Sequence, residues 1–220
     1  MRPRGRTIPL SSSRAYHPPV PVTRVVYAIG DSSIGTDDIP WRPFFHLRGM
    51  LGDSVYLKAH GVDGETSAQV LARLERDVIG RHPKPDICIV LAGVNDIQLG
   101  ASSSSIVANL EATYRALLDA GVHPIALTIY PFGDYIAWTG AGEAVRQEVR
   151  AWMQTELPST LPAVEVIDLE DVIGDLSEKN RPRLRAEYAG DDGLHTNNAG
   201  AEVVARALVE RSPTLSGRQG

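Results

Sequence analysis

The chain has 220 residues, of which 43% are hydrophobic and 22% charged, and its formal net charge is −5 at pH 7. This size and composition are typical of a globular domain with its own core, and they exclude a wholly disordered or collagen-like chain. The acidic balance argues against a nucleic-acid binder. A single cysteine, Cys88, excludes an intrachain disulfide and a cysteine-based zinc site, and its apolar neighbours predict a buried core thiol.

Both ends of the chain have the composition of loose segments. Residues 1–22 are basic, rich in serine and proline, and aperiodic, so we expect an arm before a domain over residues 23–211; residues 212–220 are interpreted as a tail for the same reasons. The arginines after Met1 resemble the start of a secretory leader, but no apolar run of roughly 7–15 residues follows. No stretch approaches the ~20 apolar residues of a membrane span, so the sequence as given favours a cytoplasmic location without an integral membrane segment.

Five short apolar runs predict β-strands. Such near-continuous runs are typical of parallel strands that are covered on both faces. They cover residues 24–29, 55–58, 86–91, 122–130 and 163–169.

The segments between these runs have helical periodicity. Apolar residues fall on one helix face in residues 106–118, 145–153 and 203–208. A further helix is predicted over residues 67–79, with Thr66 or Ser67 as its N-cap. The alternation of strands and helices predicts one doubly wound parallel sheet, in which ligands bind beyond the carboxyl ends of the strands.

The loop after the first predicted strand contains Gly30-Asp31-Ser32. Glycine permits a sharp turn out of the strand. A serine in this position lies at the edge of the sheet where ligands bind, close to a helix N-terminus with outward-facing N–H groups. Taken alone, however, Ser32 is more simply interpreted as an ordinary N-cap residue.

The next two strands also end in motifs that can reach this edge. Gly61 and Gly64 follow the second strand and would let a backbone N–H approach a ligand, although an ordinary tight turn is the simpler alternative. Asn95 follows the third strand and could direct its side-chain N–H groups to the same place. It could also be a turn residue.

Asp192 and His195 lie three residues apart on the loop before the last predicted helix. This spacing can place a carboxylate against one imidazole nitrogen and leave the other free to face Ser32. A serine hydroxyl needs such a base to act as a nucleophile near pH 7. Asp191 is the neighbouring alternative to Asp192, and a surface histidine is the alternative for His195. The motifs together supply a nucleophile, a base, an orienting carboxylate and oxyanion donors at one edge of the sheet.

Two further observations narrow the type of site. Gly52-Asp53-Ser54 repeats the serine tripeptide but precedes a strand, which would place it at the opposite end of the sheet. The motif Gly-x-Ser-x-Gly is absent from the sequence, which argues against the nucleophile elbow of α/β-hydrolases.

Four blocks in this order resemble those of the GDSL or SGNH hydrolases. The resemblance covers about residues 24–211, which is almost the whole predicted domain. The segment from Pro131 to Trp138, with residues 146–149, is also similar to a bacterial branch of lysophospholipase-like esterases. The four blocks are Gly30-Asp31-Ser32, Gly61-x-x-Gly64-x-Thr66, Gly93-Val94-Asn95-Asp96 and Asp192-x-x-His195.

The resemblance implies a three-layer α/β/α, flavodoxin-like fold with a five-stranded parallel sheet. It implies that Ser32 is the nucleophile, His195 the base and Asp192 the residue that orients His195. The oxyanion hole would consist of the Ser32 and Gly64 N–H groups and the Asn95 side chain. Family members use no metal or organic cofactor for this chemistry, so none is expected here.

The sequence departs from the family at two positions that we expect to leave the catalytic atoms unchanged. Ser33 stands where the family has leucine, and Ala59 stands where block two often has asparagine. The loop after the fourth strand contains Phe132, Tyr135 and Trp138, which are candidates for the acyl pocket.

Two other groups of residues have open interpretations. The aromatic residues after the first strand could belong to the core; they are Trp41, Phe44 and Phe45. Three arginines before the last block could meet an anionic substrate, although a solvated basic loop is the simpler interpretation; they are Arg181, Arg183 and Arg185.

The resemblance implies an enzyme that hydrolyses a small-molecule acyl ester or thioester through an acyl-enzyme. An acyltransferase or a biosynthetic tailoring enzyme would use the same acyl-enzyme with a different acceptor. A non-catalytic binding module would predict loss of Ser32, His195 or Asn95, and all three are present. The sequence does not determine the acyl chain, the alcohol or the oligomeric state.

Overall fold

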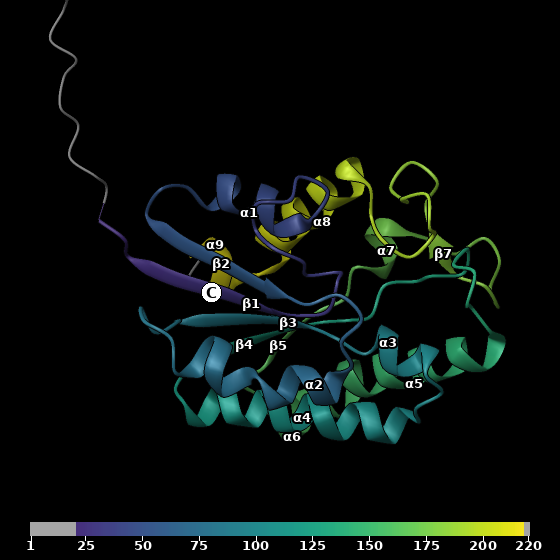
Figure 1. Cartoon of the computed structure of the whole chain (residues 1–220), viewed down its shortest axis with the longest axis horizontal. Coiled ribbons are helices and arrows are strands. Elements are labelled where there is room, and N and C mark those ends of the chain that lie inside the picture. The colour runs from purple at the N-terminus through teal and green to yellow at the C-terminus, as the bar shows by residue number, and fades with distance from the viewer. Residues whose placement is uncertain (1–20, 218–220) are drawn as a thin grey trace, which may run out of the picture.

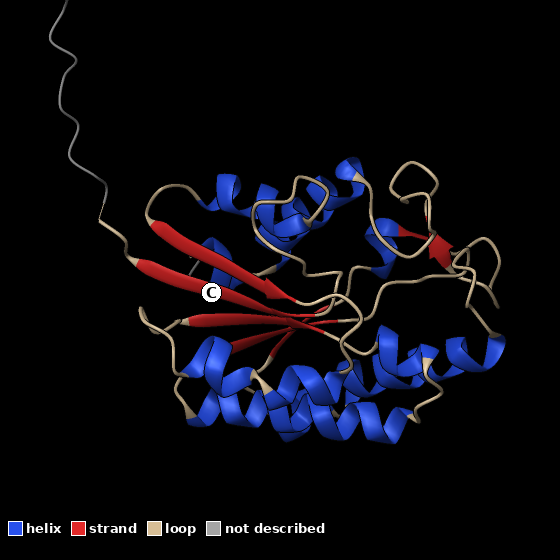
Figure 2. Ribbon diagram, viewed as in Figure 1, coloured by secondary structure: helices blue, strands red, loops and turns tan. Residues whose placement is uncertain are grey.

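The computed structural model describes residues 21–217, so most of the predicted arm lies outside the described residues. Within them, five parallel strands form one sheet in the order β2-β1-β3-β4-β5 (Figures 1 and 2). This confirms the predicted three-layer α/β/α fold. The strands are β1 (Arg24–Gly30), β2 (Val55–Gly61), β3 (Ile87–Leu91), β4 (His123–Leu127) and β5 (Glu165–Ile167).

Helices cover both faces of the sheet, above and below it in Figure 1. One face carries α1 (Pro43–Leu51), α7 (Glu170–Ile173), α8 (Asn198–Arg211) and α9 (Pro213–Ser216). The other carries α2 (Ser67–Ala72), the π-helix η1 (Glu75–Ile79), α3 (Val94–Gln98), α4 (Ser103–Asp119), α5 (Gly140–Thr155) and α6 (Leu157–Thr160). A small hairpin of β6 (Gly174–Asp175) and β7 (Arg183–Leu184) follows α7.

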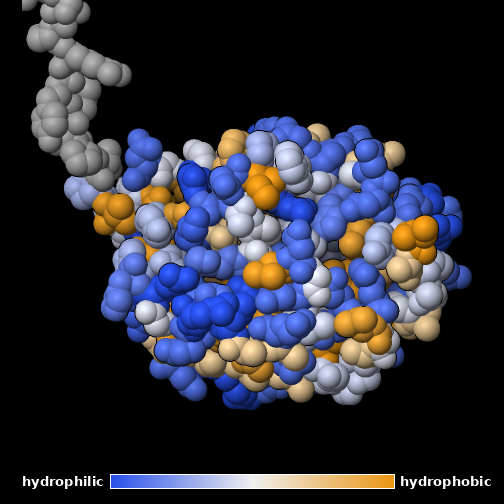
Figure 3. Space-filling view, viewed as in Figure 1, coloured by the Kyte–Doolittle hydropathy of each residue, from blue (hydrophilic) through white to orange (hydrophobic). Residues whose placement is uncertain are grey.

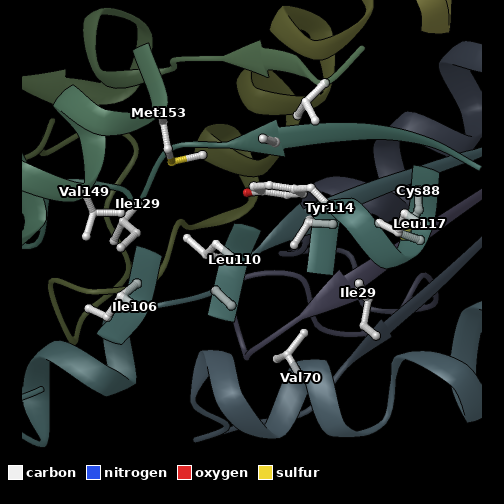
Figure 4. Packing of buried hydrophobic residues seen from close by; sticks show 14 of the residues in the cluster. Ile29, Val70, Cys88, Ile106, Leu110, Tyr114, Leu117, Ile129, Val149 and Met153 are labelled. Carbon is white, nitrogen blue, oxygen red and sulfur yellow. The ribbon is translucent and has the colours of Figure 1, made fainter. Parts of the chain in front are cut away.

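The core consists of two layers of buried side chains, one on each face of the sheet. Successive residues of a strand point to opposite faces. Ile29 therefore joins the cluster that includes Val70 and Tyr114, shown in Figure 4, whereas Ala28 joins the cluster beneath α1 and α8. Cys88 is fully buried in the first cluster, which confirms the predicted core thiol. Burial on both faces is the reason why the central strand β3 is apolar throughout, whereas the edge strand β2 also carries Lys58 and His60.

The register of the sheet brings three strand ends to one edge. Gly30, the last residue of β1, pairs with Gly61 of β2 and with Leu91 of β3. The loops after these strands therefore start side by side. This edge is where the sequence predicts the functional site.

The predicted helix over residues 67–79 is divided in the structure into α2 and η1, with Arg73 and Leu74 between them. Its start agrees with the prediction, because Thr66 is the N-cap. The Thr66 hydroxyl accepts the Gln69 N–H, and the Gln69 side chain accepts the Thr66 N–H, as in a capping box. The division lies where the buried Arg73 side chain reaches the end of β1, as described below.

The C-terminal segment differs from the predicted loose tail. Ser212 is fully buried, and its hydroxyl accepts the Leu215 N–H at the start of α9. Leu215 packs in the core, and the Arg24 guanidinium donates to the carbonyls of Thr214 and Leu215. The described part of this segment is therefore ordered through Gly217. One buried leucine and one serine cap, in a segment too short to show periodicity, are the physical reason for the difference.

Figure 3 shows polar residues over most of one face of the molecule, with scattered apolar residues among them. None of the helices formed by residues 21–217 has the length and apolar character needed to cross a membrane.

Candidate active site

Ser32 lies in a tight turn directly after β1. The Ile34 and Gly35 N–H groups both donate to the Asp31 carbonyl at 3.1 Å, and the Ser33 N–H donates to the Asp31 carboxylate at 2.8 Å. These hydrogen bonds fix the turn that presents Ser32, which is only 6% exposed. The hydroxyl is thus held at the edge of the sheet in a defined position.

Gly61 allows this turn to pack against the end of β2. A Cβ at residue 61 would lie 2.1 Å from the Gly35 nitrogen and 2.6 Å from the Asp31 carbonyl oxygen. Both contacts are with backbone atoms that cannot move without displacing the serine turn. The block-two glycine is therefore required by close approach of two chain segments.

The loop before α8 places an imidazole against Ser32. The Nε2 atom of His195 lies 2.7 Å from the Ser32 Oγ, and its Nδ1 atom lies 2.5 Å from an oxygen of Asp192. The other carboxylate oxygen of Asp192 accepts the Leu194 and His195 N–H groups, each at 2.9 Å. Asp192, rather than the adjacent Asp191, thus orients both the ring and the loop.

The two carboxyl groups nearest the serine have opposite electrostatic environments. Burial alone would raise the pKa of Asp192, but the hydrogen bonds from His195 and Leu194 outweigh it and bring the net pKa below its ordinary value. Asp192 is therefore ionised at neutral pH. Asp31 is fully buried, and desolvation raises its pKa to about 6 although the Ser33 N–H favours the charged form.

Asn95 is the second residue of α3, and its side chain is anchored to the block-two loop. One Asn95 N–H donates to the Glu65 carbonyl at 2.9 Å. Gly64, the residue before Glu65, has a φ of 77°, which glycine adopts readily and other residues do not. The structure thus joins the loops after β2 and β3, the two loops that carry the predicted oxyanion donors.

Arg73 contacts the same region from the helix layer, a role that the sequence did not predict. Its guanidinium is 6% exposed and donates to the Gly30 carbonyl at 2.8 Å, to Glu65 at 2.5 Å and to Asp77 at 3.2 Å. Gly30 immediately precedes the serine turn, and Glu65 holds Asn95. The helical segment after Thr66 was the only sequence signal in this region, and it does not indicate which arginine points inward.

Asp96 fixes the start of α2 and was also not assigned a role. Its carboxylate, which is 4% exposed, accepts the Ser67 N–H and the Ser67 hydroxyl, both at 2.7 Å. The block-three residue next to Asn95 is therefore a structural link between α3 and α2.

The aromatic residues predicted to line the acyl pocket are wholly or partly buried, and that role stays a prediction. Phe132 is 1% exposed and is part of the core, and Tyr135 and Trp138 are packed against the same cluster. An aromatic residue in a loop can serve either purpose, so the sequence could not separate them. An open pocket of about 520 Å³ next to His195 is lined by residues that include Trp41 and Arg42.

The three arginines before the last block are occupied by local contacts. Arg181 donates to the Gly133 carbonyl at 2.7 Å and lies over the Trp138 ring. Arg183 pairs with Asp175 and Glu178, and Arg185 donates to the carbonyls of Gly174 and Asp171. These contacts tie the segment to its surroundings. Of the aromatic residues after β1, Phe44 is core, whereas Trp41 and Phe45 are 53% and 42% exposed.

A model of the GDSL-like lipase/acylhydrolase family matches residues 28–203. The chain belongs to this family. The resemblance inferred from the four blocks is thereby confirmed, as is the enzyme class, a hydrolase acting on ester bonds. A comparison with curated proteins found no relative.

Solved structures share the fold at low sequence identity. A GDSL-like lipase from Bacteroides thetaiotaomicron VPI-5482 is 15% identical, with 89% of each chain covered and a TM-score of 0.70. A lipase/acylhydrolase from Enterococcus faecalis is 21% identical, with 86% of this chain and 94% of that chain covered and a TM-score of 0.65. An acetyl xylan esterase is 19% identical, with 84% and 98% covered and a TM-score of 0.68.

Proposed function

We propose that this member of the family is a serine esterase that hydrolyses acyl esters through a Ser32–His195–Asp192 triad and an acyl-enzyme. The observation that carries the proposal is the continuous hydrogen-bonded chain from the Ser32 hydroxyl through both imidazole nitrogens to Asp192. An ionised Asp192 requires a proton on Nδ1, so Nε2 of the neutral ring accepts the Ser32 O–H. This is the arrangement that a serine nucleophile needs.

Acylation follows from this proton arrangement. As the Ser32 oxygen bonds to the acyl carbon, its proton moves to Nε2 of His195, and the carbonyl electron pair moves onto the oxygen. When the tetrahedral intermediate collapses, the bond to the alcohol oxygen breaks and the imidazolium gives that oxygen its proton. Asp192 stabilises the imidazolium without taking its proton. The products of this half-reaction are the free alcohol and an ester on Ser32.

Deacylation repeats the same steps with water. His195 takes a proton from the water that attacks the acyl carbon, and then returns it to the Ser32 oxygen as the acid leaves. In both halves, the developing oxyanion is assigned to the Ser32 N–H, the Gly64 N–H and the Asn95 side chain. The Asn95 side chain uses one N–H for the Glu65 carbonyl, which leaves the second available for this purpose.

The substrate is assigned as an ester of a small or medium acyl group. The similar structures include an acetyl xylan esterase and lipases, so the fold is used for acyl groups of different length. An acyltransferase would share every residue of the triad and differ only in the acceptor. Adding alcohols to the assay and identifying the product as an acid or a new ester separates these two functions.

The test is a series of p-nitrophenyl esters of increasing acyl length, assayed with wild type, Ser32→Ala and Ser54→Ala. Ser54 is a matched control because it ends the second Gly-Asp-Ser tripeptide, at the opposite end of the sheet. We expect turnover by wild type and by Ser54→Ala, and a loss in kcat of more than about 10⁴-fold in Ser32→Ala. Retention of more than a tenth of the wild-type kcat by Ser32→Ala would exclude Ser32 as the nucleophile.

A further inference from the structure

Arg42 occupies an unusual position beside the serine turn. It is the N-cap residue of α1, yet its side chain makes no capping hydrogen bond and is 9% exposed. It lies against Gly35, where an added Cβ would be 2.7 Å from the Arg42 Cγ and 2.8 Å from its Nε. Gly35 also has a φ of 57°. The turn that presents Ser32 is therefore shaped to leave room for this arginine.

The Arg42 guanidinium has no protein partner among residues 21–217. Its buried Nε makes no hydrogen bond there, and no carboxylate of these residues forms an ion pair with it. The other arginines of the same range each donate at least one hydrogen bond or form an ion pair, including the buried Arg73 and Arg146. Buried N–H groups are nearly always satisfied, so the unpaired Nε of Arg42 beside the serine turn indicates a side chain whose protein partners are missing and which is available to a ligand.

The carboxylates around Arg42 act on it only through space. Burial lowers the pKa of Arg42 and outweighs the opposite effect of Asp63, on the loop after β2, and of Asp192, which both favour the charged form. Asp192 already uses both oxygens on the His195 loop, and Asp31 accepts the Ser33 N–H. A guanidinium stays protonated at neutral pH even when partly desolvated. Arg42 therefore carries a positive charge, and its N–H groups donate no hydrogen bond to these carboxylates.

Arg42 shares a pocket with the proposed base. The residues that line the open pocket of about 520 Å³ include Trp41, Arg42, Asp192 and His195. A ligand in this pocket can contact the base and the guanidinium at the same time. Asp191 also lines the pocket, and its negative charge repels an anion. An anionic group of a ligand is therefore expected to lie next to Arg42.

We propose that Arg42 is the anion-binding subsite of this enzyme and that its substrates are esters carrying a carboxylate or phosphate close to the scissile bond. The proposal deepens, and rests on, the proposed serine-esterase function. The planar fork of arginine binds either anion through two parallel hydrogen bonds. Trp41 would cover the adjoining part of the substrate with its exposed ring.

The kinetic test compares matched esters that differ only in charge. One pair is the butyryl ester of hydroxyacetamide and that of glycolate; the other is monobutyryl glycerol with and without a phosphate. We expect wild type to favour the anionic member of at least one pair by about 10- to 100-fold in kcat/KM, the range expected of hydrogen bonds to a charged group. The pair that shows the preference identifies the anion as carboxylate or phosphate.

Three variants assign that preference to Arg42. Arg42→Gln should remove it, mainly through KM for the anionic ester, so that the ratio of kcat/KM between the anionic and the neutral ester falls to about one. Arg42→Lys should keep part of it, because the charge remains and the fork is lost. Arg115→Gln, on the exposed surface of α4, is the control and should behave as wild type. Equal losses on neutral and anionic esters in Arg42→Gln, or no preference in wild type, would overturn the proposal.

A binding measurement separates this proposal from the esterase assignment. Titration calorimetry with inorganic phosphate and with acetate is done on Ser32→Ala, with and without Arg42→Gln, so no turnover is required. Arg42-dependent binding of either anion without hydrolysis of any ester by wild type would refute the esterase and support the subsite. Hydrolysis without a charge preference and without Arg42-dependent binding would refute the subsite alone.

Discussion

At the residue scale, Asn95 and Asp31 show how the chemistry of one side chain depends on a single neighbour. The Glu65 carbonyl accepts one N–H of the Asn95 side chain and leaves its second N–H available to another acceptor. Asp31 is held by the Ser33 N–H but is otherwise surrounded by protein, so its charged form is disfavoured. Both residues lie within the four sequence blocks, but only the three-dimensional contacts distinguish their contributions.

Replacing Asn95 should impair the transition state more than substrate binding. If its free N–H donates to the oxyanion, the contact strengthens only as charge develops on the substrate oxygen. We expect Asn95→Ala to lower kcat by about 10²–10³ with little change in KM. Asn109→Ala is the control, because this half-buried amide donates to Ser67 and has no proposed catalytic role. If kcat decreases by less than tenfold while Tm falls clearly, Asn95 has only a structural role.

The raised pKa of Asp31 predicts a pH-dependent cost to stability. Because the folded-state pKa of about 6 lies above the ordinary value of 3.8, Asp31 keeps its proton to a higher pH in the native state than in the unfolded chain. Stability is therefore lost as pH rises from about 4 to about 6, by up to about 3 kcal/mol. Asp31→Asn keeps an acceptor for the Ser33 N–H and cannot ionise.

Urea unfolding of wild type and Asp31→Asn between pH 4 and pH 7 measures this cost. We expect Asp31→Asn to gain stability relative to wild type as pH rises through this range, with a plateau above pH 6. Other titrating groups are common to both proteins and cancel in the difference. A stability difference that is constant with pH would show that Asp31 is not the source.

At the element scale, the break between α2 and η1 positions the site. Arg73 lies at this break and reaches from the helix layer to the last residue of β1 and to the loop after β2. The Glu65 carbonyl in turn accepts a hydrogen bond from Asn95 on α3. One buried guanidinium thus joins the end of β1, the loop after β2 and η1. Removing it leaves both the Gly30 carbonyl and Glu65 without this partner.

Arg73→Met should therefore lower kcat at least tenfold, and the effect should depend on Asn95. If Arg73 acts through Glu65 and Asn95, adding Arg73→Met to Asn95→Ala should cost much less than it does in wild type. Arg76→Met is the control, since Arg76 is largely exposed and also pairs with Asp77. Independent, additive effects of the two substitutions on kcat would contradict this positioning role. Urea unfolding of each variant corrects kcat for the folded fraction.

At the scale of the whole molecule, the sequence predicted the sheet and the edge where the four blocks meet. Apolar runs and helical periodicity are properties of neighbouring residues, so they can be recognised without knowing the fold. Contacts such as that between Arg73 and Gly30 join residues 43 positions apart, and no local sequence pattern predicts such contacts. The same reason explains why the position of Arg42 beside the serine turn was not predicted, and why the C-terminal segment was expected to be loose.

Ser32 is the proposed nucleophile of this chain, and covalent labelling of the protein can identify the residue that attacks the substrate. A p-nitrophenyl alkylphosphonate releases p-nitrophenolate when a serine oxygen attacks phosphorus, and leaves a stable phosphonyl ester on the protein. The intact mass of the chain and peptide mapping then locate the adduct. We predict one adduct per chain, on Ser32, absent from Ser32→Ala and unchanged in Ser54→Ala. Adduct formation on another residue, such as Ser33, or ester turnover by an enzyme that cannot be labelled would contradict the account.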